Sequence, residues 1–371
     1  MPKTRQRIIS IQACRGVAAM LVVLVHLSNV ERKDFPSHLT GIFQFGNLGV
    51  DLFFVISGVV ISTVTVGKFS NPRSAGTFLK HRLFRIFPIY WIYCAIFLSG
   101  YLYNPLWFNN STGHRVDIIQ SFLLIPTNGG MLIMQGWTLS YEMYFYLMFF
   151  LLLFFVSERL APVFLSIWGA GIVAAALLFT GPKWPVLDLV ASPLILEFLA
   201  GCLIFHIYHR AALHPRVGSV LVAISVLWLS GIVFLTYHAH GGSQLWIQDS
   251  AWARPVCYGV FAALFLLGLM ELERSNFIRF SRPFEAVGNW SYSIYLSHLA
   301  IVEIVGRVTA HFAARIPFSI FFVYAISLPL VLLLGYLSYN WIEVPLMTIL
   351  YKRTGKPGLS VRSLASVGPN P

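Results

Sequence analysis

The sequence is poor in charged side chains and has only four cysteines. Charged residues make up 11% of its 371 positions, and only 14 are acidic, whereas an ordinary soluble domain has about 25% charged residues. With 57% hydrophobic residues, a chain of this length cannot cover a globular surface with polar groups. Soluble, disordered and disulfide-scaffold proteins are therefore excluded, and an integral membrane protein remains.

Ten apolar runs are long enough to cross a bilayer, which needs roughly 20 helical residues. They cover residues 9–28, 47–66, 85–103, 136–156, 160–180, 188–207, 217–237, 253–270, 287–307 and 318–341. The stretch 116–134 is open between an eleventh span, an interfacial segment and a re-entrant segment. The runs leave no room for a separate soluble domain. We expect an all-α transmembrane domain over 1–350 and a disordered cytoplasmic tail over 351–371.

Lysine and arginine are distributed unevenly between the loops. With both termini in the cytoplasm, the inner segments hold 18 of the 26 basic residues and the outer segments hold 7. Cytoplasmic loops keep an excess of positive charge, so this orientation is favoured. The same bias explains the net charge of +12 better than nucleic-acid binding does. The first run is retained as a helix, because it contains Arg15 and His26 and has no clear signal-peptide cleavage site.

Ionisable side chains inside a bilayer are costly and usually face a bundle interior or a wet cavity. Arg15 and His26 lie eleven residues apart, which in an α-helix is about 16 Å of rise and about 20° beyond three full turns. They share one face, with Arg15 toward the inner side and His26 toward the outer side. This pattern favours two ends of a path through the protein over a snorkelling arginine and an interfacial histidine.

Two acidic residues accompany this face. Asp51 opens the second run, where its carboxylate either orients the imidazole of His26 or caps the helix N-terminus, and both interpretations stay open. Glu142 lies about one turn inside the fourth run among aromatic residues. That is the setting of a general acid or base, or of an ion pair with His26 or an arginine.

Arg82 and Arg85 stand just before the third run, at i and i+3. If the helix has begun there, they offer two guanidinium groups on one face to a phosphate-bearing ligand. On spacing alone, ordinary anchoring at the inner membrane surface explains them better.

Ser291, Tyr295 and His298 follow i, i+4, i+7 spacing in the ninth run and form one polar stripe. The stripe either lines a sugar-binding cavity or makes hydrogen bonds between helices. Glu197 in the sixth run is expected to pair with a basic neighbour. No histidine and cysteine pair has metal-ligand spacing, so neither a zinc site nor any other metal site is predicted.

These segments together resemble the acyltransferase-3 family of integral membrane O-acyltransferases. Six stretches come in the family's order, from the first run to the last: 11–26, 49–58, 82–91, 136–142, 291–298 and 343–345. The form Trp-Thr-Leu-Ser-Tyr-Glu-Met at 137–143 looks most like the branch that modifies bacterial exopolysaccharides.

The resemblance implies transfer of an acyl group, most often acetyl from acetyl-CoA, to a hydroxyl of a carbohydrate beyond the bacterial cytoplasmic (inner) membrane. The family's Arg-x10-His pattern falls on Arg15 and His26, and its Arg-x-x-Arg pattern on Arg82 and Arg85. The three arginines are then expected to hold the phosphates of CoA at the inner side. Acetyl-CoA enters as a substrate, and no tightly bound cofactor is expected.

In this scheme His26 is the catalytic residue at the outer end. Oriented by Asp51 or Glu142, it takes the proton of the sugar hydroxyl, and an acyl-histidine relay is the open variant. The polar stripe of the ninth run is the expected acceptor site. The expected partners are acyl-CoA, a carbohydrate, the lipid bilayer and polysaccharide-assembly proteins, without nucleic acid.

Two other functions compete with acyl transfer. A transporter or flippase for a lipid-linked sugar also carries intramembrane charges, but it is expected to show internal inverted repeats, and none stands out. A structural subunit of an export machine is expected to tolerate substitution of Arg15 and His26.

Overall fold

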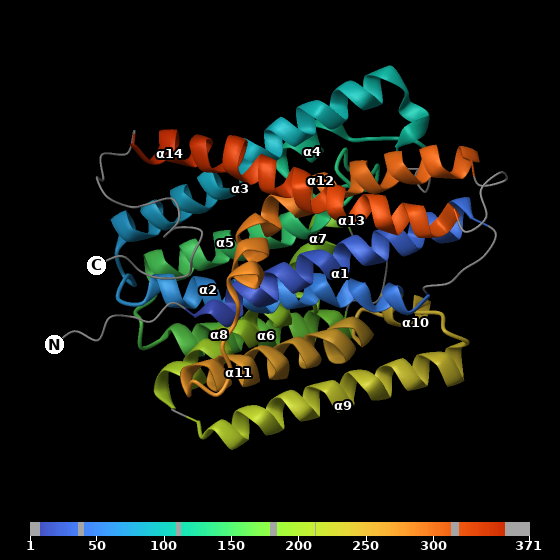
Figure 1. Cartoon of the computed structure of the whole chain (residues 1–371). Coiled ribbons are helices and arrows are strands. Elements are labelled where there is room, and N and C mark those ends of the chain that lie inside the picture. Colours follow the sequence, from blue (N-terminus) through green and yellow to red (C-terminus); the bar gives the residue numbers. More distant parts are fainter. Residues whose placement is uncertain are drawn as a thin grey trace.

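The computed structural model describes residues 8–35, 41–108, 113–178, 184–211, 213–312 and 319–352. Within these ranges the chain is helical and contains no strand. The longer helices run along one bundle axis (Figure 1). Their bounds are α1 Ile9–Asp34, α2 Leu48–Thr65, α3 Pro72–Tyr103, α5 Gly136–Phe155, α6 Ala161–Leu178, α8 Ile195–Arg210, α9 Pro215–His240, α11 Val260–Arg274, α12 Arg282–Phe312 and α13 Ser319–Ser338. Shorter elements are α4 Ile118–Leu123, α7 Pro185–Val190, α10 Leu245–Gln248, α14 Val344–Lys352, the 3-10 helices η1 Gly41–Asn47 and η2 Pro105–Trp107, and the π-helices η4 Pro255–Gly259 and η5 Tyr339–Glu343.

Ten helical segments of the described chain are long and apolar enough to cross a membrane. Their order matches the ten predicted runs, so the predicted all-α polytopic membrane architecture is confirmed. The clearest difference is in α3, which begins at Pro72, thirteen residues before the predicted span. The side chain of Asn71 caps it by accepting from the amides of Arg73 and Ser74, and Pro72 suits the first turn. The predicted tail over 351–371 lies almost entirely outside the described residues.

The stretch 116–134 is not an eleventh span. It forms α4 and an irregular loop that folds back against the side of α3. The hydroxyl of Tyr90 donates to the carbonyl oxygen of Ser121 at 2.8 Å, and the Asp117 carboxylate accepts from the amide of Gly129 at 3.2 Å. These bonds satisfy backbone groups that an irregular segment leaves unpaired.

α1 lies at the centre of the bundle (Figure 1) and contacts α2, α11, α12 and α13. Apolar side chains on one side of it, such as Val23 and Leu27, pack with α12 and α13. Those on another side, such as Ile11 and Ala18, pack with α2 and α11. α6 and α9 are the most peripheral spans, with few fully buried side chains. The central helix that carries Arg15 and His26 is therefore shielded from lipid by its neighbours.

Glycines bring several helix pairs into backbone contact. A β-carbon on Gly58 of α2 would run into the carbonyl oxygen of Phe198 on α8, and one on Gly201 into that of Val55. Gly16 and Gly288 face each other in the same way between α1 and α12, as do Gly218 and Gly268 between α9 and α11. Small residues allow this approach in membranes, where close packing drives helix association.

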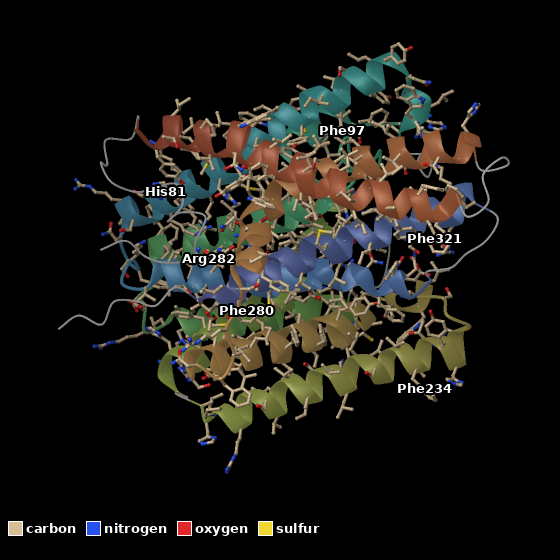
Figure 2. The ribbon with its side chains drawn as sticks, viewed as in Figure 1. His81, Phe97, Phe234, Phe280, Arg282 and Phe321 are labelled. Atoms are coloured by element: carbon tan, nitrogen blue, oxygen red, sulfur yellow. The ribbon has the colours of Figure 1, made fainter. Side chains whose placement is uncertain are left out.

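The first turn of α1 and the last turn of α14 lie at the same end of the bundle (Figure 1), called here the N-terminal end. The opposite end is called the far end. Figure 2 shows His81 and Arg282 toward the N-terminal end, and Phe97, Phe234 and Phe321 in the other half. The side chains of Phe234 and Phe321 are 65% and 57% exposed, which suits a lipid-facing surface.

We predict that Gly201→Ala destabilises the bundle, because its new β-carbon meets the backbone of α2. Overpacking of this kind costs about 1–3 kcal/mol. The measurement is thermal unfolding in detergent. Gly171→Ala on α6 is the matched control, since its β-carbon would meet nothing within 4 Å. An equal transition temperature for both variants would contradict the assigned contact.

Candidate active site

Two π-helical turns interrupt the long helices, and each adjoins a buried ion pair. η4 follows directly after Arg254, and η5 ends with Glu343. A π-turn adds a residue to one helical turn and re-aims the side chains around it, and such turns are frequent at functional sites. The two pairs lie in opposite halves of the bundle.

Asp51 and Arg254 form the pair of the far half. Nε and Nη2 of Arg254 donate to the two carboxylate oxygens of Asp51 at 2.9 and 3.1 Å. Asp51 is completely buried, and the guanidinium lies over the ring of Trp137, 5.3 Å from its centre. Asp51 stands in the first turn of α2, as predicted, but its bonding partner is Arg254. The hydrogen bonds described for the Asp51 carboxylate go to Arg254, and the predicted contact with His26 stays a prediction.

Glu197 on α8 lies beside this pair and interacts electrostatically with both Asp51 and Arg254. Its side chain is 2% exposed, and its carboxyl group lies against that of Asp51, while no other donor of the described chain reaches its oxygens. Gly259 in η4 leaves room for it, since a β-carbon there would lie 2.9 Å from Cγ of Glu197. Arg254 is thus the expected basic neighbour of Glu197, and it interacts with two carboxyl groups, those of Asp51 and Glu197.

Arg85 and Glu343 form the pair of the other half. Nη1 of Arg85 donates to one carboxylate oxygen of Glu343, and Oγ of Ser293 donates to the other at 2.7 Å. Glu343 is buried, and the guanidinium of Arg85 lies 5.5 Å from the ring centre of Tyr292. The second terminal nitrogen of Arg85 is buried and makes no hydrogen bond among the described residues. This nitrogen is a donor available to an anionic ligand.

Tyr146 on α5 connects the remaining predicted residues of the N-terminal half. Its hydroxyl donates to Oε1 of Glu142, and its ring lies 5.6 Å from the guanidinium of Arg82. Arg15 interacts electrostatically with Arg85, Glu343, Glu142 and Tyr146.

The structure therefore brings the three predicted donor-binding arginines, Arg15, Arg82 and Arg85, into one neighbourhood. It places Glu142 with them, hydrogen-bonded to Tyr146 and, at 3.3 Å, to Ser57. No described hydrogen bond joins Glu142 to His26, so of its two predicted partners the arginines are favoured.

A histidine pair lies between α1 and α12. The ring centres of His26 and His298 are 5.1 Å apart, and the rings are tilted by 47°. His298 is completely buried, and its Nδ1 lies 3.2 and 2.9 Å from the carbonyl oxygens of Ile294 and Tyr295. Because α1 also carries Arg15, this helix links the arginine cluster to the histidine pair.

The other two residues of the predicted polar stripe have different surroundings. The hydroxyl of Tyr295 is 2.6 Å from Oγ1 of Thr138 and 3.2 Å from the carbonyl oxygen of Gln135. Oγ of Ser291 is buried without a hydrogen-bond partner in the described ranges. Tyr295 therefore already joins α12 to the start of α5, and acceptor binding by Ser291 and Tyr295 stays a prediction.

Arg254, Glu343 and Tyr146 received no role from the sequence. Arg254 looks like a loop arginine, because it stands at the very start of the run 253–270. A signal did exist for Glu343, which belongs to one of the six matching stretches. The four cysteines are buried free thiols, and across the described ranges no three metal-ligating side chains come together.

The buried charges and the ten spans define a polytopic membrane protein with an enclosed polar site. The chain matches the acyltransferase domain family Acyl_transf_3 over residues 8–340, and it therefore belongs to this family of acyltransferases. The predicted membership is confirmed.

Several proteins are similar to the chain. The exopolysaccharide production protein ExoZ of Rhizobium meliloti is 27% identical over 330 residues, which cover 86% of this chain and 96% of ExoZ. The O-acetyltransferase OatA of Staphylococcus aureus is 24% identical over 367 residues, 90% of this chain and 56% of OatA. The acyltransferase MdmB of Streptomyces mycarofaciens is 24% identical over 334 residues, 82% of this chain and 81% of MdmB. No solved structure matches the chain.

We predict that removing one member of the buried pair, as in Arg254→Ala, lowers the free energy of unfolding by about 3–5 kcal/mol. The loss is large because the substitution leaves the Asp51 carboxylate buried without a donor. Unfolding in detergent measures it, and Lys33→Ala is the control. The Lys33–Glu303 pair is 43% and 32% exposed, and such pairs contribute about 0–1 kcal/mol. Equal losses would contradict the structural role of Arg254.

Proposed function

We propose that the protein transfers an acetyl group from acetyl-CoA, bound at the N-terminal end, to a hydroxyl of a carbohydrate reached from the far end. The single observation that carries this proposal is the arrangement along α1. One face of this helix takes part in an arginine cluster through Arg15 and in a histidine pair through His26. The proposed anion-binding site at Arg15 and the proposed proton-transfer site at His26 thus lie about 16 Å apart along one rigid helix.

The arginine cluster is suited to the phosphates of CoA. Guanidinium groups bind phosphate through charge-assisted hydrogen bonds, and Arg85 has a terminal nitrogen without a partner in the described structure. The excess of basic residues in the loops of the N-terminal end supports a cytoplasmic position for this end, where acetyl-CoA is made. The pantetheine arm then carries the thioester away from the phosphates, along α1 and toward His26.

His26 is the general base of the proposed reaction. It takes the proton of the acceptor hydroxyl while the hydroxyl oxygen attacks the thioester carbonyl carbon. A C–O bond forms, the C–S bond breaks, and the proton passes from His26 to the leaving thiolate to give CoA-SH. In the acyl-histidine variant, the imidazole carries the acetyl group between the two steps.

The carbohydrate acceptor is proposed from the printed names of two relatives. ExoZ is named for exopolysaccharide production, and OatA is named an O-acetyltransferase. An exopolysaccharide or its lipid-linked repeat is the acceptor that agrees with both names. Tyr295 and Ser291 on α12, close in sequence to His298, are the proposed contacts of the sugar. Such a reaction places the protein in the bacterial inner membrane.

We predict that His26→Ala abolishes acyl transfer. The measurement is the base-labile O-acyl content of surface polysaccharide from cells that lack this chain and are complemented with each variant. His238→Ala is the control, since His238 lies exposed on peripheral α9 and stacks only on Phe234. Restored acyl content with His26→Ala at matched membrane abundance would refute the proposed function.

We predict that Arg82→Gln raises the KM for acetyl-CoA by about 10- to 100-fold, the loss expected when one hydrogen bond to a charged group is removed. Initial rates of label transfer from radiolabelled acetyl-CoA in membrane vesicles provide the measurement. The control is Arg216→Gln, an exposed arginine in the first turn of α9. Equal KM values in the two variants would show that Arg82 does not bind acetyl-CoA.

A further inference from the structure

The tautomer of His298 is fixed by its helix. Its Nδ1 lies within hydrogen-bond distance of two carbonyl oxygens, those of Ile294 and Tyr295. Carbonyl oxygens only accept, so Nδ1 carries the proton and Nε2 of the neutral ring carries a lone pair. This Nε2 is completely buried and has no hydrogen-bond partner in the described structure. A buried acceptor is therefore held in a known orientation without a donor, which is costly unless a donor reaches it.

The ring of His26 lies beside that of His298. Two imidazoles joined by an N–H···N bond of about 2.9 Å have ring centres about 5 Å apart, since each nitrogen lies about 1.1 Å from its ring centre. The observed separation is 5.1 Å. The rings are tilted by 47°, so a change in ring orientation, and not a shift of the backbone, brings a nitrogen of His26 into line with Nε2.

We propose that His298 is the positioning residue for His26: its Nε2 accepts a hydrogen bond from one ring nitrogen of His26. The other ring nitrogen of His26 is then the lone-pair base that faces the acceptor hydroxyl. This inference rests on the proposed function, and it assigns to His298 the orienting role predicted above for Asp51 or Glu142. Those carboxylates are bonded to Arg254 and to Tyr146 instead.

The proposed bond also matters after proton transfer. When His26 takes the proton of the hydroxyl, both of its nitrogens carry hydrogen, and the one facing His298 keeps its neutral acceptor. The proton is returned to the departing thiolate, so His298 itself gains and loses none. The acidic group that interacts electrostatically with His26 is Glu303, further along α12 toward the far end. Orientation by a neutral ring leaves the base free of a carboxylate that would hold its proton.

The test compares His298→Asn with His298→Gln. Asparagine places an amide near Nδ1, where it can donate to the helix carbonyls, but it has no acceptor at the position of Nε2. Glutamine is one carbon longer and brings an acceptor oxygen close to that position. Initial rates are measured in membrane vesicles with radiolabelled acetyl-CoA and the cell's own polysaccharide. Rates are normalised to monodisperse protein recovered from each membrane.

We expect His298→Asn to lower kcat by about 10- to 100-fold, with KM for acetyl-CoA within about twofold of the parent. His298→Gln should recover at least part of this loss. Thr309→Val, elsewhere on α12, is the control and should keep the rate of the parent protein. The hydroxyl of Thr309 donates to the carbonyl oxygen of Val305 within the same helix. Parent-like kcat in His298→Asn, equal losses in Asn and Gln, or a change in KM alone would each overturn the inference. An active His26→Ala would refute the proposed function itself, which distinguishes the two failures.

Discussion

A charge buried among apolar helices must meet an opposite charge or a set of hydrogen bonds, and this requirement organises the interior of the protein. Arg254 forms a bidentate ion pair with Asp51, and Arg85 forms an ion pair with Glu343. In each case a π-turn adjoins one partner. A π-turn changes how the side chains before it are aimed relative to those after it. The two irregular turns therefore belong to the electrostatics of the bundle.

The two pairs leave different groups available. Around Asp51 and Arg254, the two described hydrogen bonds of the guanidinium go to Asp51. The group left without a donor there is the carboxyl group of Glu197. Around Arg85 and Glu343, the surplus is positive, because Arg15 and Arg82 stand nearby with fewer acidic partners. The electrostatic character of the interior thus changes along α1, from cationic near Arg15 to neutral and imidazole-lined at His26.

Much of the fold follows from the sequence, because apolar run length decides which segments cross a membrane. Helical spacing also placed Arg15 and His26 on one face, and the i, i+3 pair Arg82 and Arg85 does lie on a helix. The partners of the buried charged side chains could not be predicted from the sequence. Asp51 pairs with a residue 203 positions away, and Arg85 with one 258 positions away. Spacing within one helix carries no information on which neighbour completes a buried charge.

The same limit explains Glu142. The aromatic residues around it indicated a buried carboxyl group, but α5 carries its own donor, Tyr146, one turn further on. A contact at i and i+4 can be read from the sequence, but the predicted partners of Glu142 were His26 or an arginine. Likewise, the orientation of His298 depends on backbone carbonyl groups of its own helix. Every helix has such groups, so no residue pattern predicts which of them a side chain will contact.

The glycine contacts between helices bear on how such a protein can work. Gly16 against Gly288 and Gly58 against Gly201 hold α1 to α12 and α2 to α8 at backbone distance. Sliding by a turn would replace a glycine with a larger side chain at each contact, and the helices would have to separate. Rocking motions, in which whole helices exchange neighbours, are thereby opposed. Under the proposed function, the flexible pantetheine arm would then reach across the membrane while the helices stay in place.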